Sequence, residues 1–285
     1  MPLFAQHIIS PHNAKVGFLR TLHTPKGRKA AHAFLIEGPH LIDEAIKAHI
    51  MPELVLCDPA TLEGSPLLGA LTIWADNGVE VISATPTILA KVCDAQTPQG
   101  IVAVISLAAL APEKLMSQRR GRLRPLVLVL DDVRDPGNVG TMLRSALAAD
   151  VDCVLLTPNC VDVFAPKVVR AASGAHFHLP LRLDMSWDAT STYCMGAPQM
   201  QQVVVADSAG DADYTDLDLT QRTAIIIGNE AHGPSTAARA IATKRVRIPM
   251  YNQVESLNAA IAASIILFES VRQRRQTTLQ DDSTR

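Results

Sequence analysis

Five largely apolar segments in the second half of the chain constrain its fold more than any other feature. They are LVLVL at 126–130 and, further along, CVLLT, VVVAD, AIIIG and VRIPM. Strands with so little polar alternation are buried on both faces, as in a parallel sheet covered by helices. Helical patterns lie between them, at 138–149, 165–172, 234–242 and 256–272. The sequence therefore predicts a doubly wound α/β domain, whose ligands bind beyond the carboxyl ends of the strands.

The first part of the chain has a shorter version of this pattern. Apolar, strand-like segments alternate with helical spacing, as in AFLIEG followed by PHLIDEAIKAH and in PTILAKVCDA followed by GIVAVISLA. We therefore expect a smaller α/β domain at 33–110. The polar, basic and proline-bounded residues 111–124 are expected to be a linker. The second domain would then span 125–275, and 276–285 would form a flexible tail.

Basic residues cluster at the start of the chain, although the formal net charge is only −2. No acidic residue precedes Glu37, so residues 1–32 are expected to form a basic N-terminal arm. Its cations are Lys15, Arg20, Lys26, Arg28 and Lys29. A local basic patch on a near-neutral protein suits contact with phosphates, although solvated surface is the more ordinary explanation of charge alone. Aromatic residues make up only 4% of the chain, which limits the number of base-stacking platforms.

The cysteines and the apolar segments bear on location. The five cysteines have neither a Cys-x-x-Cys motif nor zinc-binding spacing, which favours reduced thiols and no metal site. The N-terminus lacks the pattern of a secretory signal. The longest apolar stretches are too short to cross a bilayer. We therefore expect a cytoplasmic protein without a membrane or metal partner.

The stretch DDVRDPGNVGTMLRSA follows the first apolar strand of the second domain. Pro136 and Gly137 are turn residues, and Asn138 is a plausible N-cap of the next helix. Arg144 lies about 9 Å further along that helix, at 1.5 Å per residue. Helical side chains lean toward the N-terminus, and Gly140 leaves the path of this arginine open. Arg144 can therefore reach the crevice beside Asn138, although a lone arginine is more often an ordinary surface residue.

A second loop, GNEAHG, follows the strand AIII. It is not a P-loop, because the lysine is missing, and no G-x-G-x-x-G occurs anywhere in the chain. The glycines are expected to let the backbone approach a ligand closely. Glu230 is the only carboxylate in the loop and could anchor hydrogen bonds or favour the start of the next helix, whereas nothing positions His232 as a base.

A third loop joins the strand ending in VRIP to a long helix. Ser256 suits the N-cap of that helix and Asn258 falls in its first turn. Capping alone would explain either residue. Both would nevertheless lie at the mouth of the same crevice as Arg144, because the carboxyl ends of parallel strands meet at one edge of a sheet.

Together the three loops resemble the SpoU (TrmH) family of SPOUT RNA methyltransferases. The motifs are DPGNVGTMLRSA, IIIGNEAHG and IPMYNQVESLNAAIAASIILFE, in the order and spacing of the family, and PKVVRAASGAHFHLP between them is also similar. FLIEGPHLIDEAI and TPQGIVAVI resemble the family's N-terminal substrate-binding module, which is similar to ribosomal protein L30e. The resemblance covers about 33–272 and is greatest to ribosomal-RNA 2′-O-methyltransferases, including the thiostrepton-resistance type.

The resemblance implies a fold and a cofactor. The C-terminal domain would contain a parallel sheet and a deep trefoil knot, and the protein would work as a homodimer. S-adenosylmethionine would bind in the knot, largely to backbone. Its expected contacts are Gly228, Ile248 and Leu257, with Asn229, Glu230 and Gly233 in the same loop.

The resemblance also implies a reaction, the transfer of a methyl group to a ribose 2′-hydroxyl of structured RNA, with 23S ribosomal RNA expected. The family motif assigns catalysis to Arg144, with Asn138, Ser256 and Asn258 around it. A guanidinium hardly deprotonates in proteins, so we expect Arg144 to stabilise the developing alkoxide while phosphate or water accepts the proton. Methylation of transfer RNA is the alternative within the class, and a non-catalytic RNA-binding protein is the alternative outside it. The missing glycine fingerprint disfavours a nicotinamide oxidoreductase.

The chain departs from the family pattern at few positions. Asn229 and Ala231 occupy variable positions of the second motif, and Tyr251 and Asn252 replace a commoner turn that contains glycine. These departures concern the shape of the loops more than the expected activity.

Overall fold

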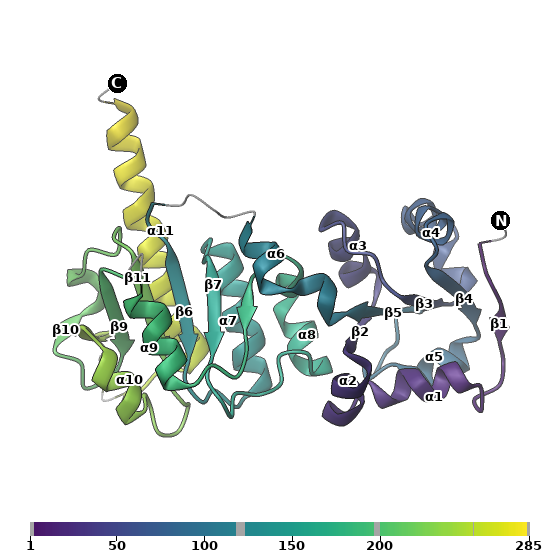
Figure 1. Cartoon of the computed structure of the whole chain (residues 1–285), viewed down its shortest axis with the longest axis horizontal. Helices are drawn as coiled ribbons and strands as arrows, with labels where there is room; N and C mark the ends of the chain where they lie inside the picture. Colours follow the sequence, from purple (N-terminus) through teal and green to yellow (C-terminus); the bar gives the residue numbers. More distant parts are fainter. Residues whose placement is uncertain (1–2, 118–122, 197–199, 253, 284–285) are drawn as a thin grey trace. The chain divides into compact units, whose positions relative to one another are not determined.

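The computed structural model describes residues 3–117, 123–196, 200–252 and 254–283 (Figure 1). The chain forms two compact units. The first comprises the residues up to 111 together with 162–177, and the second comprises 112–161 together with the residues from 178 onward.

The first unit is built on a mixed five-stranded sheet. Its strands lie in the order β1 (His7–Ile8), β4 (Glu80–Ala84), β3 (Leu54–Cys57), β5 (Ile101–Ser106) and β2 (Ala33–Glu37). β5 runs antiparallel to both of its neighbours, whereas the other pairs are parallel. Successive residues of β2 and β3 enter two different apolar clusters, so both faces of the sheet are covered. The strands expected between 33 and 110 are confirmed.

Helices supply the other half of each apolar cluster. The α-helices of this unit are α1 (Ala14–Thr21), α2 (Pro25–Ala31), α3 (Pro39–Lys47), α4 (Leu67–Asp76), α5 (Pro86–Val92) and α8 (Pro166–Ala172). α3 and α4 bury apolar residues in the cluster on one face of the sheet, and α1 and α5 bury theirs in the cluster on the other (Figure 1).

The basic arm expected at 1–32 is wrong, because residues 14–31 form α1 and α2. Val16, Leu19 and Leu22 are buried in one of the two apolar clusters of the unit. Their spacing of three residues places them on one face of a helix. Three apolar residues are enough to anchor this segment. Their helical periodicity was difficult to recognise in the sequence because charged residues surround them.

The segment 162–177 packs with the first unit, although the sequence placed it inside a domain at 125–275. Its helix α8 contacts β2, and Phe164 and Phe177 join an apolar cluster of the first unit. The guanidinium of Arg28, which is 4% exposed, donates to the carboxylate of Asp162 at 2.6 and 2.9 Å. Removing one partner of a buried pair leaves an unpaired charge, so this contact fixes the segment in place.

The second unit contains a seven-stranded sheet in which every pair of neighbours is parallel. The strand order is β10 (Ala212–Asp213), β12 (Lys244–Arg247), β9 (Gln202–Ala206), β11 (Thr223–Ile227), β6 (Leu126–Leu130), β7 (Cys153–Leu156) and β8 (Leu181–Arg182). Ile227 pairs with Leu130 on one side and with Ala206 on the other, so three carboxyl ends lie level. The doubly wound parallel architecture expected for this domain is confirmed.

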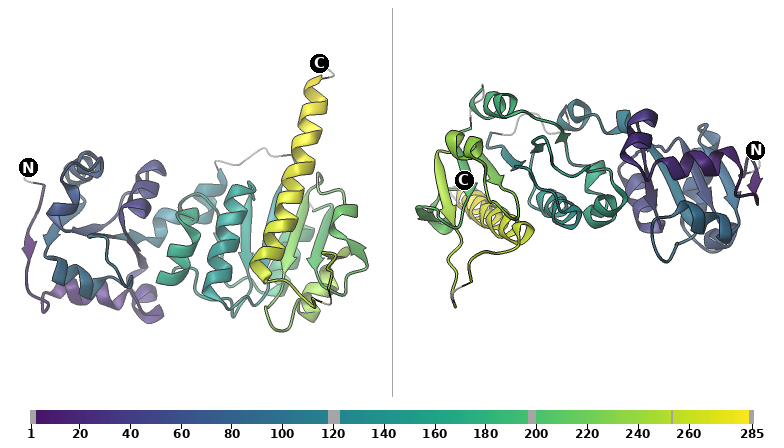
Figure 2. Two further views of the ribbon diagram at one scale, coloured as in Figure 1. Left: turned by 180° about the vertical axis from the view of Figure 1, so that it is seen from behind. Right: turned by 90° about the horizontal axis from the view of Figure 1, so that it is seen from below.

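The helices of the second unit are α6 (Pro112–Ser117), α7 (Pro136–Ala148), α9 (Trp187–Met195), α10 (Thr236–Ile241) and α11 (Ala259–Ser283). α11, the yellow helix, lies along α7 and continues past the sheet (Figure 2). Residues 276–283 are therefore helical, where a flexible tail was expected. In the expected linker at 111–124, α6 occupies part of the segment, and 118–122 lie outside the described residues.

The segment between β12 and α11 lies at the edge of the sheet where the strands have their carboxyl ends. β12 lies beyond β9, whereas α11 packs on α7, the helix that follows β6. The described residues of this segment, 248–252 and 254–258, therefore pass over the carboxyl ends of β9 and β11. The deep trefoil knot implied by the family resemblance stays a prediction. Within the described part of the chain, no helix is long and apolar enough to cross a bilayer.

We expect Leu19→Ala to destabilise the first unit, because Leu19 is fully buried. Truncating a buried leucine costs roughly 2–5 kcal/mol of unfolding free energy. Chemical denaturation of the full chain would measure the loss. Leu68→Ala is the matched control, since Leu68 is 44% exposed on α4. Equal midpoints for the two variants would mean that residues 14–31 are not part of the folded core.

Candidate active site

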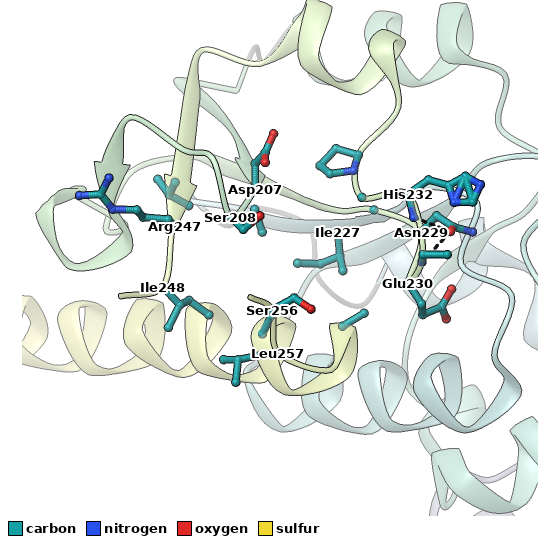
Figure 3. Close-up of a pocket in the computed structure, with 18 of the residues that line it drawn as sticks. Asp207, Ser208, Ile227, Asn229, Glu230, His232, Arg247, Ile248, Ser256 and Leu257 are labelled. Carbon is teal, nitrogen blue, oxygen red and sulfur yellow. Dashed lines mark hydrogen bonds between the residues drawn. The ribbon is translucent and has the colours of Figure 1, made fainter. Parts of the chain in front are cut away.

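A cavity of about 330 Å³ lies where the strand-end loops of the second unit meet (Figure 3). Asp207 and Ser208 line it after β9, and the loop after β11 lines it at one end. The lining is completed by Val246, Arg247, Ile248, Met250, Ser256, Leu257, Ala259 and Ala262. All six residues expected to contact the cofactor line this cavity. They are Gly228, Asn229, Glu230, Gly233, Ile248 and Leu257.

The loop at 228–233 is held in one conformation by its own backbone. The N–H of Asn229 donates to the carbonyl of Gly233 at 3.1 Å, and the reverse bond measures 2.9 Å. Gly233 has a φ of +67°, and a Cβ at Gly228 would overlap the backbone of Pro234. Both positions therefore require glycine. The side chain of Asn229 donates to the carbonyl of Asp132 at 2.8 Å, which ties this loop to the one after β6.

Glu230 joins the same two loops through its carboxylate. It accepts hydrogen bonds from the side chain of Asn138 at 3.1 Å and from the backbone N–H groups of Asp135 and Arg134 at 3.0 and 3.3 Å. Partial burial opposes ionisation of Glu230, but these hydrogen bonds more than offset it and lower the pKa of the carboxyl below its ordinary value. Of the two roles open from the sequence, the structure assigns Glu230 that of hydrogen-bond anchor.

Asn138 is a link between loops and not the N-cap expected from the sequence. Asp135 caps α7, because its Oδ1 accepts from the N–H of Asn138 at 2.7 Å. Pro136 at the first helical position starts the helix earlier. The side chain of Asn138 is thereby free to donate to Glu230 and to accept from Asn258 at 2.8 Å.

Asn258, and not Ser256, caps α11. Its Oδ1 accepts from the backbone N–H groups of Ala260 and Ile261 at 2.9 and 3.3 Å, while its Nδ2 donates to Asn138. The expected N-cap role of Ser256 is therefore wrong, since α11 begins at Ala259. Ser256 is exposed and lines the cavity, where its hydroxyl can meet a ligand. We call Glu230, Asn138 and Asn258, joined in this order, the loop-tie network.

Arg144 projects from the exposed face of α7, in the second turn after Asn138. It does not line the cavity, and among the described residues it has no hydrogen-bond or ion-pair partner. Gly140, over which its side chain was expected to pass, is buried. The structure thus places Ser256 in the lining of the cavity, whereas Asn138 is joined to the lining residue Glu230 and Asn258 is joined to Asn138. Arg144 remains as a cation on the helix that the loop-tie network orients.

Sequence reasoning missed several lining residues, of which Asp207 matters most. It follows β9 directly, so the rule that ligands bind beyond strand ends could have found it. Its carboxylate accepts from Arg239 at 3.0 Å and from the N–H of Ala209 at 3.0 Å. Burial would raise the pKa of Asp207, but these contacts outweigh burial and lower it. An ion pair, in which the ionised Asp207 is compensated by Arg239, therefore lines one wall of the cavity.

The cavity suits an organic ligand of moderate size. Its volume lies within the range of roughly 300–1,000 Å³ that is usual for ligand sites. Ile227, Ile248 and Leu257 give it apolar walls, and Asp207 and Ser208 add polar groups. Among the described residues, no group of three or more His, Cys, Asp or Glu side chains could hold a metal ion.

Comparison with known proteins supports the motif assignment. The model of the SpoU rRNA Methylase family matches residues 125–268, and that of the MRM3-like substrate binding domain matches residues 13–103. The 23S rRNA (guanosine(2553)-2′-O)-methyltransferase RlmP of Bacillus subtilis is 33% identical over 264 residues, which cover 92% of this chain and 98% of the relative. The match to the MRM3-like substrate binding domain includes α1 and α2, in agreement with their place in the first unit.

Solved structures of two bacterial enzymes match almost the whole chain. The SpoU methyltransferase AviRb from Streptomyces viridochromogenes has a TM-score of 0.81 at 30% identity, over 93% of this chain and 99% of that one. The AdoMet-bound rRNA methyltransferase from Sinorhizobium meliloti has a TM-score of 0.80 at 26% identity, over 93% and 97%. Since the family model covers half of the chain and the relatives align along nearly their full length, this chain belongs to the SpoU rRNA methylase family.

Proposed function

We propose that this chain transfers a methyl group from S-adenosylmethionine to a ribose 2′-hydroxyl of ribosomal RNA, with 23S ribosomal RNA as the target. The observation that carries the proposal is the convergence of the loop 228–233 with Ile248, Met250, Ser256 and Leu257 on one cavity, next to the loop-tie network. The Bacillus subtilis relative is named as a 23S rRNA 2′-O-methyltransferase, and AviRb has been solved in complex with AdoMet.

The cavity would hold the cofactor through backbone and apolar contacts. When bound, S-adenosylmethionine supplies an electrophilic methyl group on its sulfonium. Gly228 and Gly233 contribute backbone alone to the lining, and Ile248 and Leu257 offer apolar surface. Asn229 and Glu230 also line the cavity, but their side chains are engaged in fixing the loop, so we assign them the shape of the site.

The loop-tie network would fix the geometry of the transfer. An in-line approach of the ribose oxygen to the methyl carbon requires the cofactor loop and the start of α7 to stay in register. Holding reacting groups in place in this way can be worth roughly 7–11 kcal/mol. Asn138 donates a hydrogen bond to Glu230 and accepts one from Asn258, so both loops move with α7.

Arg144 would act on the hydroxyl through its charge. A guanidinium remains protonated, so it stabilises the developing alkoxide and does not accept the proton. Both carboxylate oxygens of Glu230 already accept hydrogen bonds and the lowered pKa makes this carboxylate a weak base, so Glu230 is not the proton acceptor either. We assign that role to an RNA phosphate or to water.

The proposal is tested by incubating the full chain with methyl-labelled S-adenosylmethionine and with separated 23S, 16S and transfer RNA. Label in 23S ribosomal RNA, mapped to one 2′-O-methylated nucleotide, is the expected result. Label in transfer RNA alone would show that transfer RNA, and not ribosomal RNA, is the target. If the cofactor binds but no RNA pool acquires label, the protein is a non-catalytic member of the family.

We expect Arg144→Lys to slow methyl transfer, because a lysine lacks the fork of donors that can surround an oxyanion. Loss of one such donor lowers the rate by roughly 100- to 1,000-fold in other enzymes. Cofactor affinity should not change, because Arg144 does not line the cavity. Single-turnover rates and calorimetric titration with the cofactor measure the two effects. A near-normal single-turnover rate would show that the fork is not needed.

Asn258→Asp separates the loop-tie role of Asn258 from its capping role. Aspartate still caps α11, but it cannot donate to Asn138 and adds a negative charge close to Glu230. We expect thermal stability near that of the wild type and a lower kcat. In Asn258→Ala the cap is also lost, which costs about 1 kcal/mol of stability. If Asn258→Asp were as active as the wild type, Asn258 would be only a cap.

We further propose that the protein is a homodimer. The C-terminal segment exposes large apolar side chains, among them Tyr251 at 82%, Ile261 at 50% and Phe268 at 48%. Ile261 and Phe268 are seven residues apart and share one face of α11. Clustered apolar exposure favours a protein interface, and a second copy is the commonest partner. The cavity would border this interface, because Leu257 lines the cavity and is itself 36% exposed.

We therefore expect Ile261→Glu to shift the protein toward the monomer. The wild-type chain should sediment at twice its mass of 30.6 kDa, and the variant nearer to 30.6 kDa itself. Leu183→Glu is the control, since Leu183 is 42% exposed elsewhere in the same unit. A wild-type chain that sediments as a monomer at micromolar concentration would rule out the dimer.

We place the reaction in the cytoplasm. All five cysteines are free, as expected in a reducing compartment. Burial raises the pKa of Cys57 to about 12 and that of Cys194 to about 11, so neither is a reactive thiolate at neutral pH.

A further inference from the structure

The first unit has a pocket of its own between α1 and α2. Its volume is about 430 Å³. It is lined by Phe18, Thr21, Thr24, Lys26, Gly27, Ala30 and Ala31, which we call the α1–α2 pocket. The absence of a side chain at Gly27 lets α2 approach the end of α1 closely, since a Cβ there would overlap the carbonyl oxygen of Thr21. The lining is therefore mostly small or apolar, with one aromatic ring and one cation.

The cations of α1 and α2 fall into two groups, and of them only Lys26 lines the pocket. Lys15 pairs with Glu80, and Arg28 pairs with Asp162, so both serve the fold. The remaining three of α1 and α2 are exposed and have no partner among the described residues. They are Arg20, Lys26 and Lys29. No acidic residue occurs in the first 36 positions of the chain, so nothing on these helices balances the three charges.

Phe18 is the aromatic group of this surface. Its side chain lines the pocket and remains 38% exposed, in a chain of which only 4% is aromatic. An accessible ring beside an apolar pocket and unpaired cations matches what single-stranded RNA offers, namely bases with apolar faces joined by phosphates. An apolar peptide would suit the pocket but not three uncompensated positive charges.

We infer that the α1–α2 pocket binds an unpaired base of the RNA substrate against Phe18, while Arg20, Lys26 and Lys29 bind the neighbouring phosphates. This inference rests on the proposed function, which supplies RNA as the substrate. The match of residues 13–103 to a substrate-binding domain is consistent with it, but assigns no residue to the task.

The pocket recognises the base by stacking and not by its edge. The Thr21 hydroxyl already donates to the carbonyl of Phe18 at 2.6 Å. The Thr24 hydroxyl donates to the carbonyl of Thr21 at 2.8 Å and accepts from the N–H of Gly27 at 3.1 Å. The O–H donors of both hydroxyls are thus used at the helix ends. Any of the four bases should therefore be accepted, since stacking tolerates sequence changes.

The first experiment measures binding of protein-free 23S ribosomal RNA to Phe18 variants of the full chain. Loss of one stacked base should weaken binding by roughly five- to a hundredfold in Phe18→Ala. Phe18→Leu should behave like Phe18→Ala, and Phe18→Trp should retain affinity. Ile73→Ala is the matched control, because Ile73 is 62% exposed on α4 of the same unit. In methylation assays the KM for RNA should rise while kcat stays unchanged.

The second experiment tests the cations by salt dependence. Lys26→Ala and Lys29→Ala should each reduce the slope of log affinity against log salt by about 1, as expected for the loss of one phosphate contact. Lys47→Ala is the control, because Lys47 is also exposed but pairs with Asp43 and Glu44.

Three results would overturn the inference. Phe18→Leu could bind RNA as tightly as the wild type, or the lysine variants could keep the full salt slope. The Phe18 variants could also act normally on free RNA and fail only on assembled ribosomal particles, in which case the pocket binds a protein. Because binding is measured without methyl transfer, a wild-type chain that binds RNA through the pocket but methylates none would contradict only the proposed function.

Discussion

The geometry of the site depends on the carboxylate of Glu230 and the hydrogen bonds that it accepts. Three of them come from residues 134–138, and Asn138 in turn accepts one from Asn258. Together with the bond from Asn229 to the carbonyl of Asp132, these bonds connect the loops after β6 and β11 with the start of α11. With them, the wall of the cavity and the first turns of α7 and α11 form one body. A carboxylate is suited to this because it accepts several hydrogen bonds at once and is ionised at neutral pH.

The two units share the chain in a way that the sequence order does not suggest. Residues 162–177 follow a strand of the second unit, yet they complete an apolar cluster of the first and are fixed by Arg28. The same α1–α2 segment that supplies Arg28 also carries the pocket that we assign to RNA. The paired and unpaired cations of α1 and α2 thus have separate tasks, since Lys15 and Arg28 hold the fold and the other three remain available to a polyanion.

Strands of four to six residues carried the prediction of both sheets, whereas β1, β8 and β10, of two residues each, were missed. The longer strands were predictable because they are apolar and separated by helical spacing, and the six cavity residues followed from motifs at the strand ends. The helix caps were not, because aspartate, asparagine and serine are all good N-caps and propensity cannot choose between Asp135 and Asn138. Pro136 gave the only indication in the sequence that Asp135 is the cap, because proline is common at the first helical position. The loop-tie network was beyond prediction, since it depends on how loops far apart in sequence meet. Asn252, which lies where the family resemblance led us to expect a turn that contains glycine, has a φ of +57°, a left-handed conformation that asparagine tolerates.

Charge pairing argues for the role of Arg144. The other arginines near the cavity have their charge compensated: Arg134 donates to Asp132 at 2.9 Å and Arg239 to Asp207 at 3.0 Å. Such a pair offers little net field to a ligand, because the carboxylate cancels the guanidinium at short range. Arg144 has no such partner among the described residues, and it lies on the helix whose first turn the loop-tie network fixes. Its uncompensated charge is therefore available to an anion that arrives with the substrate, whether an RNA phosphate or the oxygen from which the proton departs.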